Sequence, residues 1–450
     1  MMRRLNRQQS LYVGSLLFGL FFGAGNLIFP VFLGQHSGQN VGPAILGFLL
    51  TGVGLPLLGV VALGLTRSRG SFELANRISR PYAYLFTILL YLTIGPFFAL
   101  PRLATTSFQI GMVPFTGQHQ WLLVIFSLGF FLLAWWFARK PSKLIEIIGK
   151  YLNPIFLILL GSLLLIALIK PLSSISQVPA LAGYQNHAFF TGFTAGYNTM
   201  DALAALAFGV VVTDTIIGLG VTRPTAIARD TVRAGLISMS LMAIIYALLA
   251  IMGTMSAGHF KPSANGGIAL AQIANYYFGG LGSTLLALIV IIACLKTAIG
   301  LISAFGESFH RLFPEVSYLV WISLASSLAC LFANVGLTKI IAYSTPVLYF
   351  IYPLAVTLML LGILSPLFHH RQIVYLTTTS FTFLVAIIDG LNVAPASLRQ
   401  LTVSQACLNL AQHYLPLFSI GLDWLLPAII GFLVGLLLSH FWPKQIKLPV

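Results

Sequence analysis

Long apolar runs separated by short gaps dominate the hydrophobic pattern of this chain. A membrane-spanning helix needs about 20 mostly apolar residues, and twelve runs approach or exceed that length. The pattern predicts an all-α integral membrane protein with 12 transmembrane helices. The predicted segments are 11–34, 43–66, 82–108, 120–138, 144–169, 190–217, 230–255, 281–305, 316–335, 340–364, 373–393 and 423–442.

The gaps between these segments leave no room for a soluble domain, so residues 1–450 are predicted to form a single transmembrane domain. The longest gaps, 170–189 and 394–422, are mostly polar or mixed and are expected to face outside. The basic N-terminus leads into an apolar run that is long enough to span and lacks a small-residue cleavage site. We therefore interpret that run as a first membrane helix and not as a signal peptide.

Composition makes the lipid bilayer the expected solvent of this chain. Charged residues are 7% and hydrophobic residues 58% of the sequence, whereas a soluble domain carries about 25% charge. The net charge of +15 would suggest nucleic acid in a soluble protein. Here the charges lie in the short gaps and indicate topology, so no nucleic-acid partner is expected. The three cysteines show no paired spacing, and neither a metal site nor a cofactor is predicted.

The distribution of Lys and Arg fixes the expected orientation, because cytoplasmic loops carry an excess of both. With the N-terminus inside, only Lys170, Lys261, Lys339 and Arg399 fall on the outer side. Both termini are therefore predicted to be cytoplasmic. The inner set is Arg3, Arg4, Arg7, Arg67, Arg69, Arg77, Arg80, Arg139, Lys140, Lys143, Lys150, Arg223, Arg229, Arg233, Arg311, Arg371, Lys444 and Lys447.

The first segment contains a stretch that disfavours a helix, Gly23-Ala24-Gly25-Asn26, with Pro30 after it. Glycine costs about 1 kcal/mol and proline about 3 kcal/mol relative to alanine in a helix interior. One interpretation is a glycine face for close helix packing. The other is a discontinuous helix whose second half begins near Asn26 and offers free N–H groups to a carboxylate.

The sixth segment is interrupted in a similar way, because Gly192 and Gly196 precede the polar stretch Tyr197-Asn198-Thr199-Met200-Asp201. Two interrupted helices, five segments apart, indicate an inverted-repeat transporter. The halves would be residues 11–169 and 190–364, followed by two additional helices in 373–442. This repeat is predicted from spacing alone.

Charged residues inside the apolar segments are candidates for function. Lys296 lies about 15 residues, or roughly 22 Å, from the outer end of its segment and cannot easily reach either surface. It is either a structural lysine paired with Asp201 or with carbonyls, or a tethered cation or proton carrier. Arg102 follows Pro96 and Pro101, which should distort its helix. It either extends to the outer surface or forms part of an outer gate.

The motifs along the chain resemble those of the bacterial branched-chain amino acid:cation symporters, the carrier-II type for leucine, isoleucine and valine. The resemblance runs from about residue 10 to 442. Its motifs are FGAGNLIFP at 22–30, GPFFALPR at 95–102, GYNTMDALAALAFG at 196–209, SANGG at 263–267, IACLKTAIGL at 292–301 and IDGL at 388–391.

The resemblance implies the five-plus-five inverted-repeat fold of the leucine transporter, with helices 1 and 6 broken at the substrate. The implied substrate-binding residues are Gly23, Ala24, Gly25, Asn26, Asn198, Thr199, Met200, Asp201 and Ala202. The backbone of the first group would hold the carboxylate. Carbonyls of the second group would hold the ammonium, assisted by Asp201.

The resemblance also implies coupling to sodium or protons in a bacterial plasma membrane. Sodium-coupled members of this fold hold one sodium between helix 1 and hydroxyls on helix 8. Here Lys296 and Thr297 lie in that region, with Asp201 as the central acid, so we expect coupling to H+ over Na+. We expect a monomer or a weak homo-oligomer.

The pattern is compatible with one other carrier function and argues against two further classes of protein. The first is a cation-coupled carrier for another small neutral solute. The second is an intramembrane enzyme, which would need catalytic groups such as paired acids inside the spans, and none appears. The third is a channel, which would favour a charged or carbonyl-lined ring over two broken helices.

Overall fold

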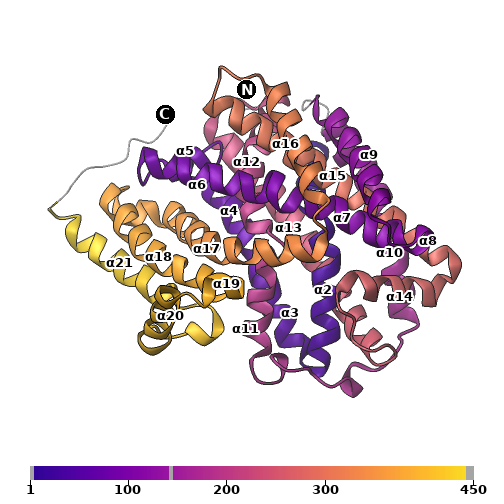
Figure 1. Cartoon of the computed structure of the whole chain (residues 1–450). Coiled ribbons are helices and arrows are strands. Elements are labelled where there is room, and N and C mark those ends of the chain that lie inside the picture. The colour runs from indigo at the N-terminus through magenta and orange to yellow at the C-terminus, as the bar shows by residue number, and fades with distance from the viewer. Residues whose placement is uncertain (1–4, 141–144, 442–450) are drawn as a thin grey trace.

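The computed structural model describes the backbone of residues 5–140 and 145–441, and its regular elements are helices (Figure 1). The helices that coincide with the predicted segments are α1 (Arg7–Phe21), α2 (Ala24–Ser37), α3 (Val41–Leu49), α4 (Leu55–Thr66), α6 (Arg80–Leu92), α7 (Ala99–Gly111), α9 (Gln120–Ala138), α10 (Asn153–Ile169), α11 (Tyr184–Tyr197), α12 (Asp201–Gly218), α13 (Pro224–Ala257), α15 (Gly280–Leu312), α16 (Tyr318–Ala333), α17 (Leu337–Leu364), α18 (Gln372–Asn392) and α21 (Leu425–Leu438). The short or peripheral helices are α5 (Ser71–Ala75), α8 (Val113–Thr116), α14 (Gly266–Phe278), α19 (Ala396–Arg399) and α20 (Thr402–Tyr414).

Many of these helices are long and apolar enough to cross a membrane. Within the described ranges, 9 helical stretches are long and apolar enough to cross a bilayer, and α16 and α21 are shorter apolar helices. The prediction of an all-helical membrane protein is confirmed, whereas the number of crossings stays a prediction. The segment ends at 144 and 442 lie outside the described residues. So do the inner-set residues Arg3, Arg4, Lys143, Lys444 and Lys447.

Two groups of helices pack around the centre of the molecule. In the first group, α2 packs on α13 and α3 packs on α11, while α12 and α13 both contact α4. In the second group, α15 packs on α7, α9 and α16. Helix α12 contacts α15 and thereby joins the two groups. The centre of the molecule is therefore enclosed by helices from both halves of the sequence.

The third predicted segment is interrupted where its prolines lie. Helix α6 ends at Leu92, a π-helical turn covers Thr93–Phe97, and α7 begins at Ala99. Gly95 in this turn has the non-helical angles φ −93° and ψ −124°. Pro96 lacks the N–H that would continue the helix ladder. The predicted distortion is confirmed, and it places Arg102 in the first turn of α7.

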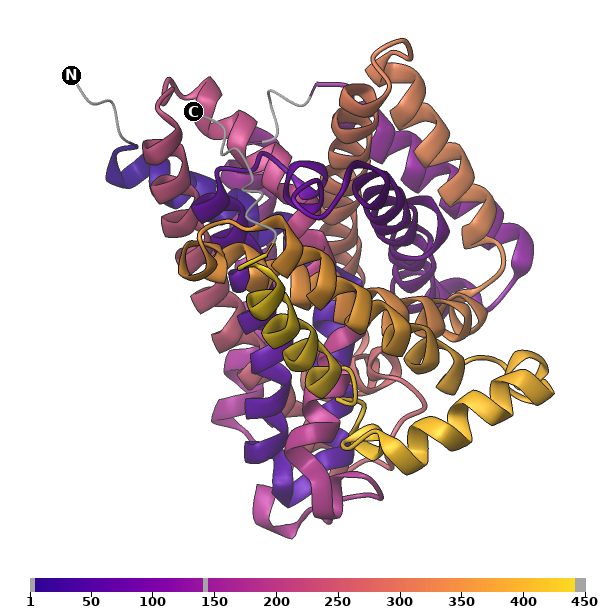
Figure 2. The same cartoon turned by 90° about the vertical axis from the view of Figure 1, so that its left-hand side faces the viewer.

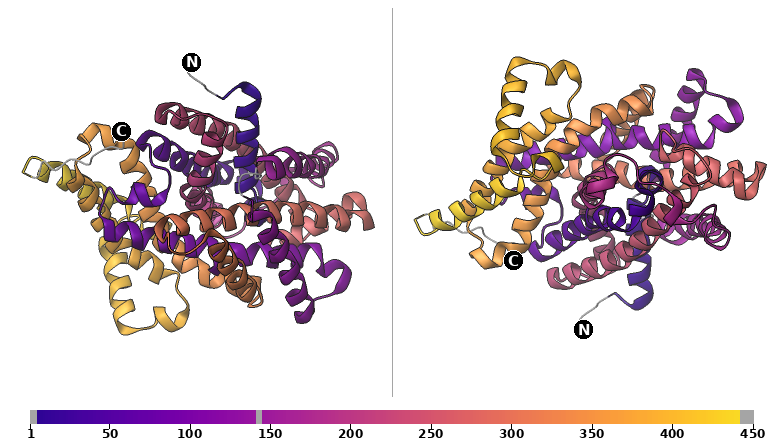
Figure 3. Two further views of the ribbon diagram at one scale, coloured as in Figure 1. Left: turned by 90° about the horizontal axis from the view of Figure 1, so that it is seen from above. Right: turned by 90° about the horizontal axis from the view of Figure 1, so that it is seen from below.

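The C-terminal helices form a separate layer. Helix α18 packs on α17 and α21, and α18 to α21 lie on the left of the bundle in Figure 1, which is the side turned toward the viewer in Figure 2. The end-on views show the same placement at the yellow end of the colour scale (Figure 3). The segment between α20 and α21 reaches α11, because a Cβ on Gly421 would lie 3.5 Å from Thr194.

Candidate functional site

The break between α1 and α2 consists of Phe22 and Gly23. Gly23 is extended, at φ −114° and ψ −154°, and its N–H donates to Asn26 Oδ1 at 3.0 Å. No side chain caps the first turn of α2. In the described part of the chain, no hydrogen bond engages the N–H groups of Ala24, Gly25 and Asn26. Free N–H groups at a helix N-terminus attract a negative charge.

The break between α11 and α12 consists of Asn198, Thr199 and Met200. Met200 adopts the left-handed conformation at φ 63°, which a residue with a side chain rarely does. Thr199 Oγ1 donates to the carbonyl of Gly196 at 2.9 Å and so closes the end of α11. The chain then starts α12 at Asp201, whose carboxylate lies in the first turn of that helix.

Asp201 connects the two breaks. Its Oδ2 accepts hydrogen bonds from Asn26 Nδ2 at 2.7 Å and from the Tyr246 hydroxyl of α13 at 2.6 Å. Asn26 Nδ2 also donates to the Tyr246 hydroxyl. Asn26 and Asp201 are each 2% exposed. This buried cluster ties α2, α12 and α13 together, and it leaves Oδ1 of Asp201 without a protein partner among the residues described.

Arg102 lies beside the first break. It is 4% exposed, and its Cζ lies 5.4 Å from the centre of the Phe29 ring. A Cβ atom built on Gly25 would lie only 3.1 Å from Arg102 Nη2. The suggestion that Arg102 extends to the outer surface is wrong, because the interrupted helix directs the side chain inward. Its role as a gate stays a prediction.

A small cavity of about 30 Å³ lies between the two breaks. This volume has room for about two water molecules, so binding of a larger solute requires the surrounding helices to move apart. The lining residues are Leu20, Phe21, Gly23, Ala24, Gly25, Asn26, Ile94, Ala99, Arg102, Leu103, Thr199, Met200, Asp201, Ala204, Phe208, Thr297 and Leu301. Most of the predicted site residues therefore meet here. Asn198, Ala202 and Lys296 do not line the cavity.

Lys296 lies next to this cavity but faces away from Asp201. It is fully buried, and its ammonium donates to Asn153 Oδ1 of α10 at 2.9 Å. The same ammonium lies 3.8 Å from the ring centre of Phe156 and 5.0 Å from that of Phe18. The alternative in which Lys296 pairs with Asp201 is wrong, because the neutral amide of Asn153 is its partner.

Helices α1 and α15 meet beside Lys296. Thr297 Oγ1 donates to the carbonyl of Gly19 at 3.4 Å. Asn153 Nδ2 donates to the carbonyl of Ser15 and, at 3.1 Å, to Ser15 Oγ. Ser15 Oγ in turn donates to the carbonyl of Gly149 at 2.9 Å. A chain of polar groups therefore leads from Lys296 across α10 to α1.

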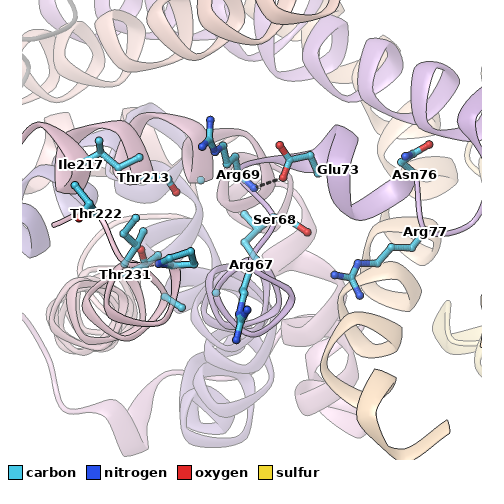
Figure 4. A pocket seen from close by; sticks show the side chains of 16 residues that line it. Arg67, Ser68, Arg69, Glu73, Asn76, Arg77, Thr213, Ile217, Thr222 and Thr231 are labelled. Atoms are coloured by element: carbon cyan, nitrogen blue, oxygen red, sulfur yellow. Dashed lines mark hydrogen bonds between the residues drawn. The ribbon is translucent and has the colours of Figure 1, made fainter. Parts of the chain in front are cut away.

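A second and larger cavity, of about 800 Å³, lies between the ends of α4, α12 and α13 and the short helix α5 (Figure 4). Its lining includes Arg67, Arg69 and Arg77. Glu73 accepts a 2.8 Å hydrogen bond from the backbone N–H of Arg69. All three arginines belong to the predicted inner set. No cluster of three His, Cys, Asp or Glu side chains that could hold a metal occurs in the described residues.

Sequence reasoning missed Tyr246, Asn153 and the helix α14. Tyr246 and Asn153 are single polar groups in apolar segments, and this was the only signal that they gave. For α14 the signal was Asn265, whose side chain accepts from the N–H groups of Gly267 and Ile268 at 3.0 Å each. Such an N-cap before an apolar run marks a helix start.

Comparisons with known proteins agree on one family. The family model described as "Branched-chain amino acid transport protein" matches residues 6–442. The branched-chain amino acid permease BrnQ of Lactobacillus delbrueckii subsp. lactis is 46% identical, over 96% of this chain and 97% of the relative. BrnQ of Bacillus subtilis is 40% identical, over 99% of this chain and 100% of the relative.

Solved structures share the fold at much lower identity. A Na+-coupled sialic acid symporter aligns with a TM-score of 0.61 at 14% identity, covering 98% of this chain and 91% of that one. MhsT in complex with L-phenylalanine aligns with a TM-score of 0.58 at 15% identity, covering 97% and 99%. Mhp1, a nucleobase-cation-symport-1 family transporter, aligns with a TM-score of 0.58 at 11% identity, covering 98% and 94%.

Proposed function

This chain belongs to the family of branched-chain amino acid transport proteins, and on that premise we propose that it imports leucine, isoleucine and valine together with a cation. The family makes it a transporter and not an enzyme, and its apolar helices make it a multi-pass membrane protein. The observation that carries the proposal is the cavity between two helix breaks. It combines free N–H groups, opposite charges and apolar side chains.

The proposed architecture is twelve crossings, with two five-helix repeats in 11–169 and 190–364 and two further helices in 373–442. The packing of the helices supports it. An exchange of the halves turns the contact of α2 with α13 into that of α12 with α4, and both pairs of helices are in contact. The contact of α9 with α15 likewise corresponds to that of α16 with α7.

In the proposed site, the substrate carboxylate binds at the N–H groups of Ala24, Gly25 and Asn26. The ammonium binds at the end of α11 and beside Asp201. The branched tail lies against apolar side chains that line the cavity, such as Phe21, Leu103 and Phe208. A second charge on a substrate would be buried there without a partner, which is costly. Neutral branched amino acids are therefore the preferred substrates.

The proposed coupling ion is the proton, and Lys296 is its proposed carrier. Lys296 lies where α1 and α15 meet, and a second cation there would be repelled in a medium of low dielectric. Its partner Asn153 is uncharged, so no carboxylate holds the ammonium in its protonated form. The polar chain from Asn153 to Ser15 ties Lys296 to α1, so a movement of α1 would change the surroundings of the ammonium.

The proposed orientation places both termini in the cytoplasm of a bacterial cell. Arg67, Arg69 and Arg77 gather around one cavity (Figure 4). Such a concentration of arginine at one end of the helices fits the cytoplasmic side.

Competition experiments test the proposed substrate. In proteoliposomes preloaded with unlabelled leucine, external labelled leucine should enter by exchange, and external isoleucine and valine should block its entry. Glutamate and lysine should not block it, because each brings a charge that the cavity does not match. If glutamate or lysine blocked the entry of labelled leucine as strongly as valine does, the proposed selectivity would be refuted.

A further inference from the structure

The guanidinium of Arg102 is a buried charge that has no partner among the described residues. Only 4% of the residue is exposed, and it lines the cavity between the helix breaks. Within the described ranges, no hydrogen bond or ion pair engages its side chain. The Phe29 ring covers it at 5.4 Å. A buried arginine normally pairs with a carboxylate or a phosphate, so the group that pairs with Arg102 has to enter the cavity.

The position of Arg102 identifies that group. A Cβ on Gly25 would be 3.1 Å from Arg102 Nη2, so the guanidinium lies beside the first turn of α2. That turn presents the free N–H groups of Ala24, Gly25 and Asn26. A guanidinium and a helix N-terminus both attract negative charge, and here they face the same small space.

We propose that Arg102 binds the carboxylate of the transported amino acid, together with the first turn of α2. This inference rests on the proposed function and deepens it. Arg102 is then a determinant of substrate specificity and not only a gate. The planar guanidinium offers two parallel N–H donors to one carboxylate, which fixes the orientation of the amino acid in the cavity.

Asp201 completes the recognition from the opposite side. Its Oδ2 is held by Asn26 and Tyr246, while its Oδ1 has no partner in the described part of the molecule. Arg102 and Asp201 do not pair with each other there. A zwitterion satisfies both charges at once. An amine without a carboxylate leaves Arg102 unpaired, and a carboxylate without an amine leaves Asp201 unpaired.

A gate that acts only by closing would need a partner for Arg102 on the protein. Asp201 is the acid that lines the same cavity, and the structure keeps the two side chains apart. A purely structural arginine would hydrogen-bond to carbonyls, as Arg77 does with the carbonyl of Thr66 at 2.7 Å. Arg102 does neither.

The test compares leucine with leucinamide, which keeps the amine and the branched tail but replaces the carboxylate by a neutral amide. Both compete with labelled leucine for binding to the purified protein. The wild type should bind leucinamide at least roughly 100-fold more weakly than leucine, because the amide leaves buried donors and a charge unpaired. In Arg102→Gln the ratio of the leucinamide Kd to the leucine Kd should fall to about tenfold or less.

Arg77→Gln is the control, because it removes a buried arginine from the other cavity and should leave the ratio at the wild-type value. If Arg102→Gln does not fold, Arg102→Lys replaces it. Lysine keeps the charge but loses the bidentate geometry, so leucine affinity should fall by roughly tenfold and leucinamide affinity less.

If either Arg102 variant lost affinity for leucine and for leucinamide by the same factor, the proposal would be overturned and Arg102 would be structural. A wild-type protein that binds leucine and leucinamide equally would overturn it as well. A wild-type protein that binds none of leucine, isoleucine and valine would instead refute the proposed function on which the inference rests.

Discussion

Asn26 holds the two helix breaks in register. Its Oδ1 accepts from the N–H of Gly23 at 3.0 Å, and its Nδ2 donates to Asp201 at 2.7 Å and also to Tyr246. One amide therefore satisfies the N–H of Gly23, directly before α2, and the carboxylate at the start of α12. Because buried polar groups need such partners, the position of the Asp201 carboxylate depends on this side chain.

Gly25 is the residue at which a side chain would do most harm to the site. A Cβ there would be 3.1 Å from Arg102 and 3.3 Å from Phe29. Gly25→Leu should abolish leucine uptake, because the added side chain fills a cavity of only about 30 Å³ and covers the N–H groups of α2. The measurement is labelled-leucine uptake by variant protein in proteoliposomes.

Gly129→Leu is the matched control, since a Cβ on Gly129 would meet nothing within 4 Å. It should leave uptake unchanged. Normal transport by Gly25→Leu, at an equal amount of inserted protein, would contradict a site at the first helix break.

At the scale of elements, glycines allow two helix pairs to approach closely. Between α2 and α13, a Cβ on Gly34 would be 2.8 Å from the backbone nitrogen of Thr254. Between α3 and α11, a Cβ on Gly192 would be 2.9 Å from the carbonyl carbon of Ala44. Small residues drive such contacts in lipid, where apolar association alone is weak. In α2 this contact is made by Gly34, and not by the stretch Gly23–Asn26 for which a glycine face was considered.

Gly253 tests this packing, because a Cβ there would be 3.0 Å from the backbone of Val31. Gly253→Leu should lower the melting temperature of the purified protein, since overpacking a well-packed contact typically costs about 1–3 kcal/mol. Gly161→Leu, which meets nothing within 4 Å on α10, is the control. Equal melting temperatures for the two variants would show that α2 and α13 do not need this close contact.

The sequence predicted the positions of helices better than the directions of their side chains. Hydrophobic length alone placed a helix at 120–138, where α9 lies. It could not show that Arg102 faces inward, because that depends on the π-helical turn at Thr93–Phe97. It could not show that Lys296 contacts Asn153, because the two residues are 143 positions apart and meet only through packing. The short helix α14 escaped because its length is below that of a membrane span.

At the scale of the whole molecule, the proposed substrate site and the proposed proton carrier Lys296 lie next to each other but are separate. Thr297 lines the cavity, whereas Lys296 beside it faces Asn153 and the aromatic rings. A movement of α1 against α15 would change the surroundings of both residues at once. In the proposed mechanism, the contact of these two helices would link substrate binding to proton release.

The most direct measurement is leucine accumulation in sodium-free proteoliposomes with an imposed pH gradient, acidic outside. The wild type should accumulate labelled leucine above its external concentration, and Lys296→Ala should lose this dependence on pH while it keeps downhill exchange. Lys170→Ala, which alters an exposed lysine, should behave as the wild type. Accumulation that requires a sodium gradient and ignores the pH gradient would contradict a proton-driven branched-chain amino acid symporter.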